Sequence, residues 1–161
     1  MSLELQYEDF IVVTGDLDLV DVSNKTAMES KGWVFHGKEG CGTGNWYKDK
    51  EDEYPCKGSA SWYCSGSDIG SISVKFKGPG LATLDFGNCY KKGIVEVFLN
   101  GGRKSTANAN VKSKRIIFEF STGDELKIIE KGSGIIKLNS LNVECIAGSI
   151  GCSSNSKLYK G

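Results

Sequence analysis

The stretch GIVEVFLNGG, residues 93–102, decides the fold of this 161-residue chain. Its apolar side chains Val95, Val97 and Leu99 are spaced two residues apart, which is the period of a strand with one buried face. The sequence Asn-Gly-Gly at 100–102 follows, and both residue types tolerate the positive φ of a tight hairpin turn. The stretch therefore predicts a β-strand that ends in a hairpin.

The same two-residue period continues on both sides of this stretch, in segments that mostly end near Gly, Asn or Asp. Short strands separated by frequent turns are typical of a β-sandwich or barrel. One short helix is predicted over 23–30, with Ser23 as its N-cap. Glu96, Glu119 and Lys127 are expected on solvated sheet faces. We predict an all-β, antiparallel, single-domain sandwich over 1–161, with further strands at 3–7, 10–14, 17–22, 71–76, 81–86, 115–120, 125–129 and 140–145.

Residues 32–66 are predicted to be a long, irregular, cysteine-rich loop region, and 103–113 a solvated hairpin. An even number of cysteines in a small glycine-rich domain favours disulfides over free thiols, and the absence of a CxxC pair argues against zinc. The first three cysteines are expected to tie down the loop region. The last two would close a short loop, with a bridge to Cys89 as the alternative. The six are Cys41, Cys56, Cys64, Cys89, Cys145 and Cys152.

Disulfides imply a secreted, extracellular protein, although the first ten residues have no signal-peptide pattern. The sequon at Asn24 is a candidate glycosylation site, consistent with secretion. Lysine plus arginine equals aspartate plus glutamate, at 20 each. This balance argues against a nucleic-acid partner and against adhesion to anionic lipid, and no apolar run is long enough for membrane insertion.

Catalysis is poorly supported by the sequence. A serine or cysteine triad needs an imidazole; His36 is the only histidine, and no motif of nucleophile-elbow type accompanies it. No pair of carboxylates stands out among the acidic residues, and the glycine-rich stretch at 37–44 lacks the ending of a phosphate-binding loop. We therefore expect a binding protein rather than an enzyme.

The aromatic residues provide the candidate ligand site. Trp46 and Tyr47 lie in a polar, glycine-flanked stretch, where exposed rings would stack on the C–H faces of a sugar. The alternative is that aromatics of this region, Trp33 and Trp62 above all, form a satellite core under the loop. The predicted ligand-binding residues are Trp46, Tyr47, Tyr54, Asn88 and Tyr90, with Asn88 supplying amide hydrogen bonds.

Alternating acidic residues at Asp16, Asp18 and Asp21 offer oxygen ligands for a calcium ion, although their spacing does not match an EF-hand loop. The alternative is a solvated strand edge. No other metal or cofactor is predicted.

Residues 71–145 resemble the galactose-binding-like jelly-roll superfamily, which includes carbohydrate-binding modules of families 6 and 35 and discoidin-type domains. The resemblance rests on VEVFLNG at 95–101, on the strands around GDEL at 123–126, and on LNSLNV at 138–143, where Asn139 replaces a frequent Asp. It implies a jelly roll, a structural calcium ion and a glycan ligand. We therefore expect an extracellular, lectin-like binding module; the alternative is a structural or adhesive extracellular protein acting through protein contacts or self-assembly. The sequence leaves the oligomeric state open.

Overall fold

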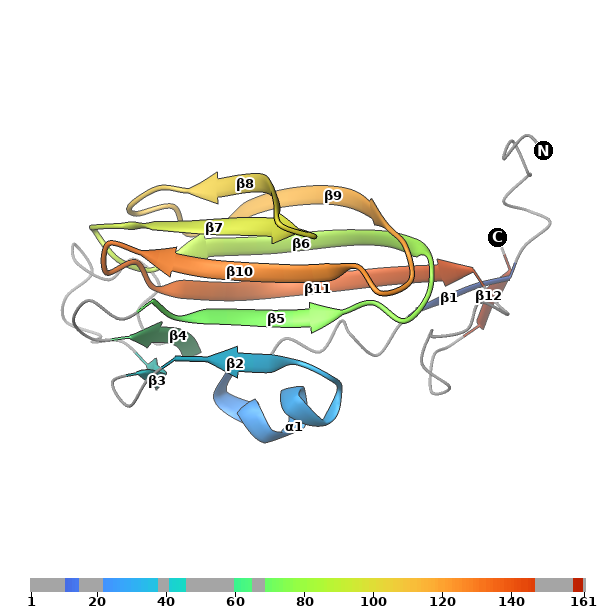
Figure 1. Cartoon of the computed structure of the whole chain (residues 1–161), viewed down its shortest axis with the longest axis horizontal. Coiled ribbons are helices and arrows are strands. Elements are labelled where there is room, and N and C mark those ends of the chain that lie inside the picture. Colours follow the sequence, from blue (N-terminus) through green and yellow to red (C-terminus); the bar gives the residue numbers. More distant parts are fainter. Residues whose placement is uncertain are drawn as a thin grey trace.

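The computed structural model describes residues 11–14, 22–37, 41–45, 60–64, 69–146 and 158–160. These residues form two short helical elements and twelve strands (Figure 1). The elements are β1 (Ile11–Thr14), η3 (Val22–Asn24), α1 (Lys25–Ser30), β2 (Val34–His36), β3 (Cys41–Asn45), β4 (Ala60–Cys64), β5 (Ser71–Lys75), β6 (Gly80–Asn88), β7 (Ile94–Leu99), β8 (Gly102–Ala107), β9 (Lys114–Phe120), β10 (Glu125–Lys131), β11 (Ile136–Ile146) and β12 (Leu158–Lys160).

The strands form two antiparallel sheets. In the first sheet β11 is central: β6 and then β9 lie on one side of it, and β1 with β12 and β4 with β3 lie on the other. The second sheet has the order β2-β5-β10-β7-β8. From β5 to β11 the chain crosses repeatedly from one sheet to the other, and only the β7–β8 hairpin stays within a sheet. This winding makes the fold a β-sandwich of jelly-roll type.

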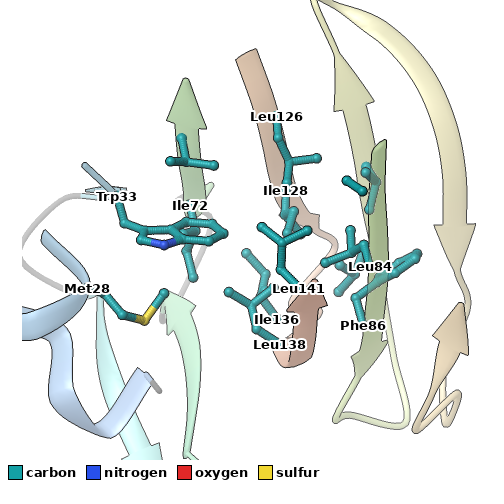
Figure 2. Packing of buried hydrophobic residues seen from close by; sticks show 14 of the residues in the cluster. Met28, Trp33, Ile72, Leu84, Phe86, Leu126, Ile128, Ile136, Leu138 and Leu141 are labelled. Carbon is teal, nitrogen blue, oxygen red and sulfur yellow. The ribbon is translucent and has the colours of Figure 1, made fainter. Parts of the chain in front are cut away.

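The core lies between the two sheets, as the two-residue period requires. Ala82, Leu84 and Phe86 of β6 are completely buried. They face the second sheet, whose strand β10 contributes the buried Leu126 and Ile128 (Figure 2). Burying apolar surface of this kind stabilises the fold by about 25 cal/mol per Å².

The first helix adds to one margin of this core. Met28 of α1 and Trp33 after it are buried and belong to the same core cluster as Ile72 of β5, and Figure 2 shows the Trp33 ring next to Ile72. Trp62 of β4 is also buried, with its ring 5.1 Å from that of Phe35 in an edge-on arrangement. Trp33 and Trp62 are therefore buried, as predicted, but they belong to the main core rather than to a separate satellite core.

The structure corrects several local predictions. The region 32–66 is not irregular throughout, because it contributes β2, β3 and β4 to the sheets. The stretch 103–113 is not a solvated hairpin: its first part belongs to strand β8, and its second part is the connection from β8 in the second sheet to β9 in the first. The α1 N-cap is Asn24 rather than Ser23, and the Asn24 side chain accepts a hydrogen bond from the Ala27 N–H.

A further correction concerns Glu96, which was expected to be solvated. It points away from the core but is buried, because Arg103 and Lys131 cover it with ion pairs of 3.2 and 2.8 Å. These two cations lower the pKa of the Glu96 carboxyl, and the hydrogen bond from Lys131 is the largest cause.

Candidate functional site

Three turns meet at one end of the sandwich, which we call the loop end. They are residues 89–93 after β6, residues 108–113 after β8, and residues 132–135 after β10. In Figure 1 these connections lie on the left, opposite the end at which β1 and β12 lie. The two sheets thus bring turns from distant parts of the sequence to one place.

Asn88 fixes the loop end from the inside. Its side chain is completely buried; Nδ2 donates to the carbonyl oxygens of Lys92 and Gly93, and Oδ1 accepts from the N–H groups of Tyr90 and Ile135. One amide therefore satisfies four main-chain groups in two turns. Both of its N–H hydrogens are used, so the Asn88 amide is not available to a ligand, which corrects the prediction made from the sequence.

The turn after β8 is held tightly against the end of β6. The Asn88 N–H donates to the Val111 carbonyl at 2.8 Å, and the Asn110 N–H donates to the Tyr90 carbonyl at 2.9 Å. A Cβ atom at Gly87 would lie 2.3 Å from the Lys112 carbonyl oxygen, so only glycine allows this approach. The two turns consequently form one hydrogen-bonded unit.

A cluster of polar side chains lies on the outer side of the first sheet at this end. The Ser113 hydroxyl and the Asn139 amide both donate to Asp85 Oδ1, at 2.6 and 2.9 Å. Asn139 Nδ2 also donates to the Lys112 carbonyl oxygen at 3.2 Å, and Arg115 lies 3.8 Å from Asp85 Oδ2. We call Asp85, Ser113, Asn139 and Arg115 the Asp85 cluster.

The Asp85 cluster depends on an irregularity in β11. Leu138 pairs with Phe86 and Ser140 with Asp85, so Asn139 is an extra residue in this ladder. A bulge of this kind turns a side chain to a new direction and often occurs beside functional sites. Ser113 and Asn139 are exposed, and the side chain of Asp85 is 13% exposed. The cluster is a partly solvated set of carboxylate, hydroxyl, amide and guanidinium groups, which suits a ligand rich in hydroxyl groups.

Tyr90 is the aromatic residue of the loop end. It is half-buried, and its main chain is held by Asn88 on one side and by Asn110 on the other. Exposed lysines follow at Lys91 and Lys92 and recur at Lys112. The loop end therefore combines a half-buried tyrosine, exposed lysines and the Asp85 cluster, next to turns that are fixed by main-chain hydrogen bonds.

The remaining predicted residues fall outside the described parts of the chain. Trp46, Tyr47 and Tyr54, and the acidic residues Asp16, Asp18 and Asp21, lie there and stay predictions. Within the parts that the structure describes, no group of three or more His, Cys, Asp or Glu residues is placed to hold a metal ion. Asn24 is described and exposed, and its glycosylation stays a prediction.

Of the six cysteines, Cys89 alone has a described side chain; it is completely buried and disulfide-bonded. Cys41 and Cys64 are opposite each other in the β3–β4 ladder. The pairing of the cysteines and the predicted disulfide-linked loop remain predictions.

No protein-family model matches this chain, and no curated protein matches it in sequence. Among solved structures, it is similar to a family 35 carbohydrate-binding module from Paenibacillus barcinonensis, with 13% identity and a TM-score of 0.41 over 70% of this chain and 91% of that one. It is also similar to a family 35 module from Clostridium thermocellum, with 12% identity and a TM-score of 0.40 over 69% of this chain and 90% of that one.

A third similar structure is the C-terminal family 6 module of a laminarinase from Zobellia galactanivorans, with 9% identity and a TM-score of 0.40 over 70% of this chain and 98% of that one. Families 6 and 35 are those that the sequence pattern resembles. At these identities and TM-scores, the likeness transfers neither a ligand nor the role of any residue. In the described part of the chain, no helix is long and apolar enough to cross a membrane.

Proposed function

We propose that this protein is a non-catalytic, extracellular carbohydrate-binding module that holds its glycan at the loop end. The observation that carries the proposal is the Asp85 cluster, in which polar groups from β6, β9, β11 and the turn after β8 meet on a rigid sheet, with Tyr90 in the adjoining turn. The groups suit a sugar because hydroxyl groups both donate and accept hydrogen bonds.

Each part of the loop end has a separate task in this proposal. Asp85 accepts hydrogen bonds from sugar hydroxyl groups. Both hydrogen bonds of Asn139 use Nδ2, so its amide oxygen has no partner among the described residues and accepts a further one. The Tyr90 ring packs on the apolar C–H face of a sugar ring. Asn88 and Gly87 keep these groups in place without touching the ligand.

An extracellular location is supported by the disulfide of Cys89, because disulfides persist in oxidising compartments. Trp46, Tyr47 and Tyr54 belong to the same proposal as a second set of stacking residues. Mass spectrometry of non-reduced peptides tests the disulfides in the natural protein. Six free thiols would contradict the extracellular assignment.

The binding experiment starts from a glycan array that includes neutral and acidic oligosaccharides, with and without calcium. Titration calorimetry then measures the best ligand against Tyr90→Ala, Asn139→Ala and Trp46→Ala. We expect each substitution at a contacting residue to weaken binding about tenfold, with folding unchanged by circular dichroism. Thr122→Ala, which changes an exposed residue at the opposite end, is the matched control.

The outcomes separate the parts of the proposal. Loss of binding in Tyr90→Ala and Asn139→Ala supports the loop end as the site. Loss in Trp46→Ala alone moves the site to residues 46–54. The absence of saturable binding to any glycan contradicts the module itself, and turnover of a glycoside contradicts the non-catalytic assignment.

A further inference from the structure

Strand β9 forms an open margin of the first sheet. It pairs with β6 on one side, and no described strand pairs with its other side (Figure 1). A strand in this position presents unpaired N–H and C=O groups, which form a template for another strand. Natural proteins usually cover or shorten such an edge, whereas β9 is seven residues long.

The outward side chains of β9 form a symmetric pattern. Ile117 is 66% exposed, and it is the most exposed large hydrophobic residue in the described part of the chain. Arg115 precedes it by two residues and Glu119 follows it by two, and both are exposed on the same face. A positive and a negative charge thus lie at equal distances on either side of an exposed apolar side chain.

This pattern complements itself when two β9 strands run antiparallel. With Ile117 opposite Ile117 of a second copy, Arg115 of each chain lies opposite Glu119 of the other. Opposite charges directly across a ladder stabilise the pairing, and like charges destabilise it. A parallel in-register pair would set Arg115 against Arg115, so the charges also select the orientation.

The inward side chains fit the same register. Ile116 would lie opposite Phe118 of the second copy, and both pack against the core of their own chain. The paired strands would therefore extend the sheets and their apolar layer without a break. Leu81 of β6 is 37% exposed on the outer face. It pairs with Glu119, and Thr83, two residues further along β6, pairs with Ile117, so Leu81 lies diagonally beside Ile117.

We propose that the free edge of β9 binds a second copy of this chain, as an antiparallel β9–β9 pair centred on Ile117. The result is a two-fold symmetric dimer with one continuous sheet across both molecules. The two proposals share Arg115, which lies 3.8 Å from Asp85 Oδ2 in the Asp85 cluster. The reversal at Glu119 therefore tests the interface without changing the proposed glycan site. The interface involves one strand from each chain, so we expect it to dissociate on dilution.

Sedimentation velocity over a range of protein concentrations up to about 1 mM measures this equilibrium. Arg115→Glu and Glu119→Arg each create two like-charge pairs across the interface. Each is expected to weaken dimerisation about tenfold. The double variant R115E/E119R restores both opposite-charge pairs and should return the dissociation constant close to that of the unmodified chain. Glu144→Arg, a reversal on β11 of the same sheet face, is the matched control.

Cross-linking tests the register separately. Ile117→Cys places the two new thiols directly opposite each other and should form an intermolecular disulfide under mild oxidation. Glu119→Cys places them about 13 Å apart along the strands and should not. A chain that stays monomeric at the highest concentration would overturn the proposal. So would a dimer whose stability is indifferent to the single reversals, or one that the double reversal fails to restore.

Discussion

The two ends of the sandwich use asparagine in similar ways but differ in what remains for a ligand. At the end opposite the loop end, which we call the turn end, Asn100 Nδ2 donates to Asp124 Oδ1 at 2.6 Å and Asn100 Oδ1 accepts from the Glu125 N–H at 2.9 Å. Asp124 Oδ2 also accepts from the Ser121 N–H. These polar side chains hold the turns and each other.

At the loop end one buried residue, Asn88, holds four main-chain groups of the turns. The Asp85 cluster adds one hydrogen bond to a turn, from Asn139 Nδ2 to the Lys112 carbonyl oxygen, whereas the Asp85 carboxylate holds no main-chain group among the described residues. The comparison teaches that the presence of polar residues in turns does not identify a site. The informative feature is which polar groups remain after the main chain has been satisfied.

Asn88→Ala should give the largest effect and is the strongest way to break this comparison. Removing the amide leaves four buried or half-buried main-chain groups without their partner, and each unsatisfied group costs about 1–3 kcal/mol unless water enters. We expect a loss of at least about 3 kcal/mol in the free energy of unfolding, measured by urea denaturation.

The control for this prediction is Asn142→Ala, because Asn142 is exposed on β11. It should change stability by less than about 0.5 kcal/mol. If Asn88→Ala is equally mild, then Asn88 does not fix the loop end and the distinction between the two ends fails.

Asp124→Ala should have a smaller effect at the turn end, because the residue is more accessible to water. It removes two hydrogen bonds, and we expect a loss of about 1–2 kcal/mol at neutral pH. The hydrogen bonds from Asn100 and from the Ser121 N–H lower the pKa of the Asp124 carboxyl. Its stabilising contribution is therefore present above the ordinary aspartate pKa and is lost as the pH falls through the lowered value.

Thermal unfolding of the unmodified chain and of Asp124→Ala between pH 2 and pH 7 measures this dependence. The difference in melting temperature should shrink toward acidic pH. Glu144→Gln, which changes an exposed residue of the central strand β11, is the comparison variant. A difference that stays constant over the whole range would show that the Asp124 carboxylate does not hold the turn end through its charge.

The sequence predicted strands in both sheets because burial of one face sets their two-residue period. In β6, β9 and β10 the burial alternates along much of the strand, as the pattern predicts. In β5 and β7 the predicted apolar residues are buried, but Ser71, Ser73 and Glu96 beside them are buried as well. Strand β8 has the sequence GRKSTA and only Ala107 of it is buried. An edge strand that contributes so little to the core has no alternating signal, and the sequence therefore predicts only a solvated hairpin at 103–113.

The candidate site was less predictable because it depends on register. Asp85 and Asn139 are 54 residues apart in sequence and meet only because β6 pairs with β11 around a bulge. Nothing in the local sequence of either residue indicates this contact. The sequence predicts that the Asn88 amide donates or accepts hydrogen bonds with a ligand, but burial decides its role. The burial of Glu96 was unpredictable for the same reason, because the side chains that cover it, Arg103 and Lys131, come from the neighbouring strands β8 and β10.

Glu130 offers the finest test of the difference between the ends. Its side chain is completely buried in β10 at the loop end, where Oε1 accepts from the Gly70 N–H at 2.8 Å. Oε2 has no hydrogen-bond partner among the described residues. Burial raises the pKa of this carboxyl above its ordinary value of 4.5, although the Gly70 hydrogen bond acts in the opposite direction.

The sign of the pH effect at Glu130 is therefore opposite to that at Asp124. The folded chain binds the Glu130 proton more tightly than the unfolded chain, so the stability linked to this proton is present below pH 4.5 and is lost as the pH rises through the folded pKa. Glu130→Gln keeps an acceptor for Gly70 and removes the titration. Near pH 4.5 we expect Glu130→Gln to change the free energy of unfolding less than Asn88→Ala or Asp124→Ala does. At higher pH the free energy of unfolding of Glu130→Gln should rise progressively relative to that of the unmodified chain, as measured by urea denaturation. Should the two proteins keep a constant difference from pH 4 to pH 8, the Glu130 carboxyl does not titrate with folding, and the loop end contains no buried acid of this kind.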